Sequence, residues 1–166
     1  MGTLIKYGFM FIVLVLVQVL VLNQVHFGGY INPFIYILFV MLLPAYTPRY
    51  LLLLSGFLIG LVIDVFSNSL GMHAAATVFI AFIRPFVIRS ISNRDEDRHD
   101  YPGIKQNSVS WFLYYTIIMV FSHHFVFFYL EFFTFTHFLS TFVRIIFSSL
   151  FSVFTIVLSQ FLIFRE

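Results

Sequence analysis

The chain contains no cysteine, which excludes disulfide bonds, thiolate metal sites and cysteine nucleophiles. It also contains little charge, since only 10% of its 166 residues are charged, against about a quarter in a soluble globular domain. In place of charge, 61% of the residues are hydrophobic, and long apolar stretches recur from end to end. The composition predicts an integral membrane protein with one membrane domain over residues 1–166, because no Gly-, Ser- or Pro-rich linker divides the chain.

The motifs of several catalytic classes are absent as well. The adjacent His123 and His124 do not belong to an HExxH zinc motif, and Ser55 does not lie in a GxSxG motif. There is no GxxxxGK[ST] loop for nucleotide phosphates and no basic groove for nucleic acid. Asp64 has no second carboxylate in its region for acid–base chemistry. We therefore expect a protein that is not an enzyme and that has no catalytic residue, cofactor or metal.

Six apolar segments approach the length of about 20 residues that a membrane-spanning helix needs. The first resembles a secretory signal, but no small-residue cleavage site follows it, so we interpret it as a retained helix. The second is short and bounded by Pro33 and Pro44, with Asn32 expected as its N-cap and Pro33 at its first position. The prediction is an all-α bundle of six transmembrane helices, at residues 7–24, 30–46, 50–66, 72–90, 110–131 and 141–164.

The distribution of basic residues predicts the orientation of this bundle. If the N-terminus is cytoplasmic, only Arg144 lies near the outer side, so both termini are expected in the cytoplasm. The connection over residues 93–108 is then cytoplasmic, and its mixed charges suit either a solvated loop or a docking strip for a partner. The basic residues on the cytoplasmic side are Lys6, Arg49, Arg84, Arg89, Arg94, Arg98, Lys105 and Arg165.

One spanning segment carries small residues and an acid on the same stripe. Gly56 and Gly60 form a GxxxG pattern, and Asp64 follows one i+4 step later. Glycines on one stripe let another backbone approach closely, so this face should be covered by protein rather than lipid. The small side chains of Ala74 and Ala75 on the next helix predict that the two helices form a close-packed hairpin.

An acid inside a membrane segment is a candidate functional residue. Arg84 differs from Asp64 in predicted depth by about 10 Å, so we expect no direct pair, with Arg84 extending towards the cytoplasm beside a Pro85 kink. Asp64 lies near the outer turn, where it can order that turn, or instead bind a partner or take part in transport. Its candidate donors are the turn amides, Ser67, Asn68 and His73, in the turn that ends at Gly71.

The histidines of the fifth segment offer a weaker signal. His123 and His124 are adjacent, so they point about 100° apart on a helix, and we expect that they do not line one site. His124 and Glu131 are seven residues apart and share a face, which favours hydrogen bonding between helices over a metal site.

Three stretches of the sequence resemble a known family. The stretch GFLIGLVIDVFSNSLGMHAAA, followed by FIRPFVIR, resembles the rod-shape-determining protein MreD family, most specifically at Gly60, Asp64, Gly71 and Ala74. The stretch INPFIYILFVMLLP resembles the family's second span. The chain departs from many members in its short tail after the last span, ending Phe164–Arg165–Glu166.

This resemblance implies a non-enzymatic scaffold of the cell-elongation machinery in the bacterial inner membrane. Its expected partner is the membrane-anchored protein MreC, through which it would connect MreB filaments to the RodA glycosyltransferase and its penicillin-binding transpeptidase. The family also resembles in fold the substrate-binding subunits of energy-coupling-factor vitamin transporters. A transporter subunit that binds a small molecule is therefore the alternative, although the first helix lacks the AxxxA stripe that serves docking in that class.

Overall fold

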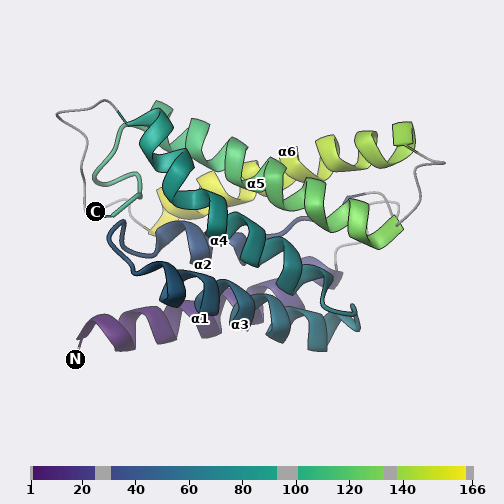
Figure 1. The fold of residues 1–166 in the computed structure, drawn as a ribbon, viewed down its shortest axis with the longest axis horizontal. Coiled ribbons are helices and arrows are strands. Elements are labelled where there is room, and N and C mark those ends of the chain that lie inside the picture. The colour runs from purple at the N-terminus through teal and green to yellow at the C-terminus, as the bar shows by residue number, and fades with distance from the viewer. Residues whose placement is uncertain (1, 25–30, 93–100, 133–137, 164–166) are drawn as a thin grey trace.

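The structure is a computed structural model, and it describes residues 2–24, 31–92, 101–132 and 138–163. Figure 1 shows the helices running back and forth between two ends of the molecule. We call the end where α1 starts and α6 stops the base, and the opposite end, with the α3–α4 turn, the tip. The elements are α1 (Gly2–Leu20), the short 3-10 helix η1 (Leu22–Gln24), α2 (Ile37–Leu42), α3 (Arg49–Ser67), α4 (Met72–Ile91), α5 (Val109–Phe132) and α6 (Phe138–Ile163).

Five helical segments of the described chain are long and apolar enough to cross a membrane, so the prediction of an all-α, multi-pass membrane protein is confirmed. Their ends lie within a few residues of the predicted ones, except that α1 already begins at Gly2. Which end faces the cytoplasm stays a prediction. Residues 93–100 of the predicted cytoplasmic loop, and most of two predicted outer connections, lie outside the described residues.

The prediction of a helix over residues 30–46 is wrong. Residues 31–35 are not helical, and only the six residues of α2 form a helix. Asn32 is therefore not a helix N-cap, and Pro33 is not a first helical position. Leu43 ends α2 in an extended conformation, as expected for a residue that precedes a proline. The segment nevertheless runs through the interior from the tip to the base (Figure 1).

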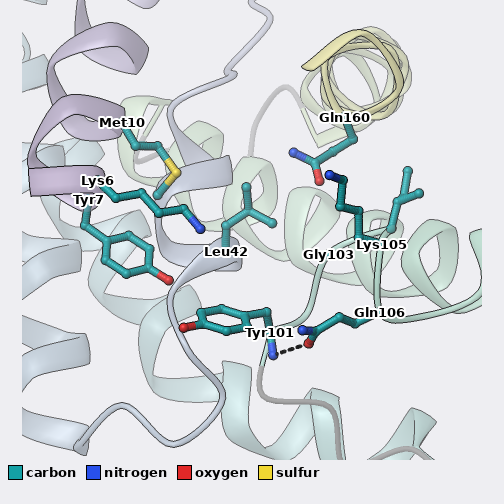
Figure 2. Close-up of a pocket in the computed structure, with 10 residues that line it drawn as sticks. Lys6, Tyr7, Met10, Leu42, Tyr101, Gly103, Lys105, Gln106 and Gln160 are labelled. Carbon is teal, nitrogen blue, oxygen red and sulfur yellow. Dashed lines mark hydrogen bonds between the residues drawn. The ribbon is translucent and has the colours of Figure 1, made fainter. Parts of the chain in front are cut away.

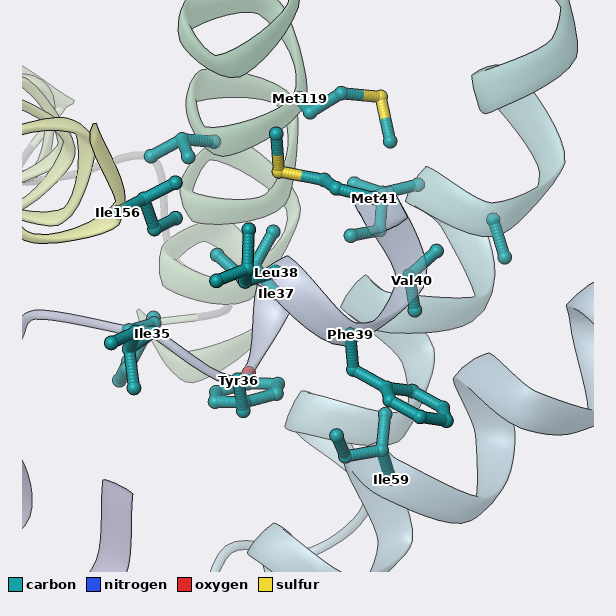
Figure 3. Packing of buried hydrophobic residues seen from close by; sticks show 14 of the residues in the cluster. Ile35, Tyr36, Ile37, Leu38, Phe39, Val40, Met41, Ile59, Met119 and Ile156 are labelled. Carbon is teal, nitrogen blue, oxygen red and sulfur yellow. The ribbon is translucent and has the colours of Figure 1, made fainter. Parts of the chain in front are cut away.

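Helix α2 forms the centre of the core. All residues from Ile37 to Met41 are buried, so the helix is apolar around its whole circumference, as expected for an element that other helices surround. Figure 3 shows Met41 next to Met119 of α5 and Phe39 directed towards Ile59 of α3. Burial on every side explains how a helix too short to span a membrane can lie between longer ones.

The predicted close packing of α3 against α4 is confirmed. A Cβ atom added at Gly56 would lie 2.9 Å from the Thr77 carbonyl oxygen, and one added at Gly60 would lie 2.5 Å from Cα of Ala74. These distances leave no room for a side chain, so the glycines set the separation of the two helices. Ala74 lies in this contact, whereas Ala75 is exposed, and its predicted packing role is wrong because it points to the opposite side of α4.

The turn between α3 and α4 needs two left-handed residues. Asn68 ends α3 with φ 51°, and its backbone N–H donates to the carbonyl oxygen of Asp64. Gly71 precedes α4 with φ 82°, a conformation that glycine adopts without strain. Together they reverse the chain within a few residues and bring the start of α4 beside the end of α3.

The separation of α3 and α4 can be tested by substituting Gly60. Gly60→Ala should lower the stability by about 1–3 kcal/mol, because the new methyl group would overlap the backbone of Ala74. Thermal unfolding of the purified protein in detergent measures this effect. Gly8→Ala is the matched control, since a Cβ atom at Gly8 meets nothing within 4 Å. Equal melting temperatures for the two variants would contradict the contact.

Candidate functional site: a buried polar network

Asp64 of α3 caps the start of α4. One carboxylate oxygen accepts the backbone N–H of His73 at 3.0 Å and the Ser69 hydroxyl at 2.7 Å, and the other accepts the backbone N–H of Ala74 at 2.8 Å. These two amides belong to the first turn of α4, where backbone donors lack a partner within the helix. Gly71, the N-cap residue, has no side chain to accept them. A carboxylate at this position is also favoured by the helix dipole.

The donors to Asp64 differ in part from the predicted set. Ser69 donates from the turn, and His73 donates through its backbone rather than its ring. The Ser67 hydroxyl instead accepts a hydrogen bond from the Asn23 side chain at 3.0 Å, and Asn68 acts through its backbone conformation. The geometry thus gives Asp64 the turn-ordering role, which was one of the two roles left open.

The ring of His73 belongs to a chain of three buried side chains. The Tyr36 hydroxyl lies 2.7 Å from Nδ1 of His73 and 2.8 Å from Nε2 of His123. One hydroxyl proton can be donated to only one ring, so the other ring donates to the tyrosine oxygen. Phe34 lies against both rings, with centroid separations of 5.1 Å and 5.6 Å. These hydrogen bonds connect α4 and α5 through Tyr36, the residue that precedes α2.

Polar side chains from α1 and α6 form hydrogen bonds with the backbone of residues 32–35, the non-helical stretch before α2. Gln18 of α1 donates to the Pro33 carbonyl at 3.0 Å and accepts the Ile35 N–H at 2.9 Å. On α6, the Ser148 hydroxyl accepts the Asn32 N–H at 3.0 Å, and the Ser152 hydroxyl accepts the Phe34 N–H at 2.8 Å. Non-helical backbone is tolerated at membrane depth only where protein or water supplies such partners.

His124 of α5 also contacts the non-helical residues 32–35, directly at Asn32 and through Ser152. Its Nδ1 lies 2.9 Å from the Val120 carbonyl oxygen, which can only accept, so Nδ1 carries a proton. Its Nε2 lies 3.2 Å from the Ser152 hydroxyl and 3.4 Å from the Asn32 carbonyl oxygen; in the neutral ring Nε2 is an acceptor, and the shorter contact is then a hydrogen bond donated by Ser152. Ser152 thus accepts from the backbone of Phe34 and donates to His124, and its single hydroxyl connects α6, α5 and the segment.

His123 and His124 bond different partners, in keeping with the divergent directions of adjacent helical residues, yet one aromatic side chain lies against both. Both rings are fully buried, and both contact Phe34, at centroid distances of 5.6 Å and 5.0 Å. Adjacent helical residues do point apart, but Phe34 fills the angle between them. The expectation that the two histidines do not line one site could not include a non-helical segment entering beside α5.

Arg84 does not extend towards solvent, so that prediction is also wrong. Its side chain is 1% exposed, and its guanidinium donates to the carbonyl oxygens of Leu43, Met41 and Pro44. Its Nε donates to the Tyr115 hydroxyl at 3.1 Å, which in turn donates to the Met41 carbonyl. The guanidinium therefore caps the C-terminal end of α2, where carbonyl groups lack helical partners and positive charge is favoured.

A polar cavity of about 520 Å³ opens beside this network at the tip. His73 and Phe34 lie at its inner side, and Asn23, Ser67 and Glu131 add polar groups to its wall. The described residues contain no group of three or more His, Asp or Glu side chains placed to hold a metal ion.

Several residues of the network were missed by sequence reasoning. Gln18 was visible as the polar side chain within the first apolar run, and Ser148 and Ser152 share a helix face at i and i+4. Tyr36 carried no such signal, because within a predicted helix over residues 30–46 it is one aromatic residue among apolar neighbours.

Comparisons of the chain with protein-family models, with characterised proteins and with solved structures find no match. The resemblance to the MreD family thus stays a hypothesis that rests on the quoted residues.

Asp64 variants test the cap. Asp64→Asn should cost about 1–2 kcal/mol, because an amide keeps one acceptor oxygen but faces the second backbone N–H with a donor. Asp64→Leu should cost at least about 3 kcal/mol, because three donors lose their acceptor. Ser69→Ala, which removes one donor and leaves the cap in place, should be the mildest. Melting temperatures in any other order would contradict the cap.

Arg84 variants test the support of α2. Arg84→Met should cost more than about 2 kcal/mol, because buried carbonyl groups at the end of α2 lose their donor. Arg84→Lys should fall between this variant and the wild type, since an ammonium cannot reproduce the planar fork that reaches several carbonyls and Tyr115. Arg89→Met, an exposed position in the last turn of α4, is the control. Equal effects at both arginines would show that Arg84 does not hold α2.

Proposed function

We propose that the protein is an MreD-like, non-enzymatic scaffold in the bacterial inner membrane. In this proposal it binds an MreC-like protein that is anchored by a transmembrane helix, and through that partner it organises the RodA-like glycosyltransferase and the penicillin-binding transpeptidase for lateral peptidoglycan synthesis. Both termini and the base would face the cytoplasm, in line with the distribution of Lys and Arg.

The internal use of the buried polar groups supports a structural role. Asp64 and Arg84 each hold a helix end of the same chain, and Gln18 and Ser152 hold its backbone before α2. Side chains that satisfy backbone groups are not available to act on a substrate without loosening the fold. A scaffold needs a rigid shape of this kind.

An apolar groove on the α5–α6 face is the observation that carries the scaffold proposal. Its volume is about 560 Å³, and its lining is almost entirely apolar. Leu150 and Phe154 of α6 lie in it and are 67% and 62% exposed. A concave apolar surface on a membrane helix pair suits a single transmembrane helix, which packs by van der Waals contact. The anchoring helix of an MreC-like protein is the occupant that this proposal names.

The cavity at the tip favours a second candidate function. A volume of about 520 Å³ with polar walls lies in the range of small-molecule sites. In this reading the protein is the substrate-binding subunit of a transporter, and His73 and Asn23 line the site.

Capture of a partner tests the scaffold. The tagged protein is purified in mild detergent from bacteria that also produce an MreC-like protein, and bound chains are identified by mass spectrometry. Phe154→Ala should reduce recovery of the MreC-like chain several-fold, because it removes an aromatic side chain from the groove. Phe57→Ala is the control, since Phe57 is an exposed aromatic residue on α3, outside the groove.

The outcomes separate the two candidate functions. Recovery of the MreC-like chain that falls with Phe154→Ala and not with Phe57→Ala supports the scaffold. Recovery of transporter ATPase chains instead, together with a small molecule released on denaturation, would support the transporter subunit. Equal recovery with both variants would remove the groove from the proposal.

A further inference from the structure

A small pocket at the base combines an apolar interior with two lysines. Its volume is about 150 Å³, and it lies between the start of α1, the end of α2, residues 101–106 and α6. Met10 and Leu42 supply apolar surface, while Lys6 and Lys105 supply positive charge (Figure 2). No acidic residue is found among the described residues that line it.

Two buried donors in this pocket have no partner among the described residues. Gln160 of α6 is 1% exposed, and its Nε2 group makes no hydrogen bond within the part of the chain that the structure describes. The same holds for the hydroxyl group of Tyr7 on α1. Other buried polar atoms of the described residues, such as Nδ1 of His123, also lack a partner, so it is their place in a pocket that distinguishes these two. Both residues line the pocket, so a ligand there can satisfy them.

The position of Lys6 adds charge to these donors. Its ammonium group lies 5.3 Å from the ring centroid of Tyr101 and 5.7 Å from that of Tyr7. Both rings belong to the pocket, so the ammonium group is held at the pocket rather than extended away from it (Figure 2). An ammonium group, an amide donor and a hydroxyl group that line one pocket are a donor set that suits a phosphate group.

We propose that this pocket binds the phosphate group of an anionic phospholipid. The apolar surface of Met10 and Leu42 favours a lipid over free phosphate, because inorganic phosphate has no apolar part to cover it. The pocket also lies at the base, where the spanning helices end and lipid headgroups are expected. The site does not depend on the scaffold role, so either proposal can fail alone.

Lipid binding to the purified full chain tests this site. The protein in detergent is titrated with short-chain phosphatidylglycerol and, separately, with short-chain phosphatidylcholine, and bound lipid is counted by native mass spectrometry. Phosphatidylglycerol should bind more tightly. Lys6→Gln should weaken it about fivefold, the usual effect of one basic residue near an anionic lipid. Arg49→Gln is the matched control, because Arg49 is exposed at the start of α3 and does not line the pocket.

A second variant addresses the buried donor. Gln160→Leu should weaken phosphatidylglycerol binding without lowering the melting temperature, because the lost amide had an unpartnered donor in the lipid-free protein. Equal binding of the two lipids, or equal weakening by Lys6→Gln and Arg49→Gln, would overturn the site. Release of phosphatidylglycerol by an equal concentration of inorganic phosphate would assign the pocket to free phosphate and overturn the lipid.

Discussion

The structure depends on hydrogen bonds to the backbone N–H and C=O groups of a non-helical segment, which lies inside a bundle of membrane helices. Residues 31–35 lack helical hydrogen bonds, and lipid offers no replacement. Gln18, Ser148 and Ser152 supply the missing donors and acceptors from helices on two sides of the segment. The register of α1 and α6 is therefore fixed relative to this segment by specific hydrogen bonds, in addition to apolar contacts that lipid could replace. This gives the bundle a single arrangement where van der Waals packing alone would allow sliding.

Two buried charged side chains also form hydrogen bonds with backbone groups, in their case at the ends of helices. Asp64 meets the backbone donors at the start of α4, and Arg84 meets the backbone acceptors at the end of α2. Each charge is paired with the end of a helix dipole of opposite sign, so neither needs a counter-ion. Residues of two different helices thereby fix the ends of two others. The arrangement explains how two buried charged side chains coexist in one small membrane domain.

The sequence was sufficient for features that depend on local pattern. The lengths of α3, α4, α5 and α6, and the approach at Gly60, follow from apolar runs and from small residues at helical spacing. It was insufficient for features that depend on contacts between distant segments. The stretch before α2 looks helical in isolation, but residues 31–35 are not helical, and residues more than a hundred positions away bind their backbone. Arg84 was misplaced for the same reason, since its acceptors are 40 to 43 residues away along the chain.

These constraints leave functional capacity at the ends and on the lipid-facing surface. The network holds Asp64, Gln18 and Tyr36 in internal hydrogen bonds, and it borders the cavity at the tip through His73. That cavity has amide and hydroxyl groups and the acid Glu131 in its wall, whereas the pocket at the base has Lys6, Lys105 and two donors without a partner among the described residues. The two ends therefore favour ligands of different charge. Under the proposed scaffold role, a bundle held in one arrangement by these hydrogen bonds would present the cationic base, the polar tip and the apolar groove to their ligands at fixed relative positions.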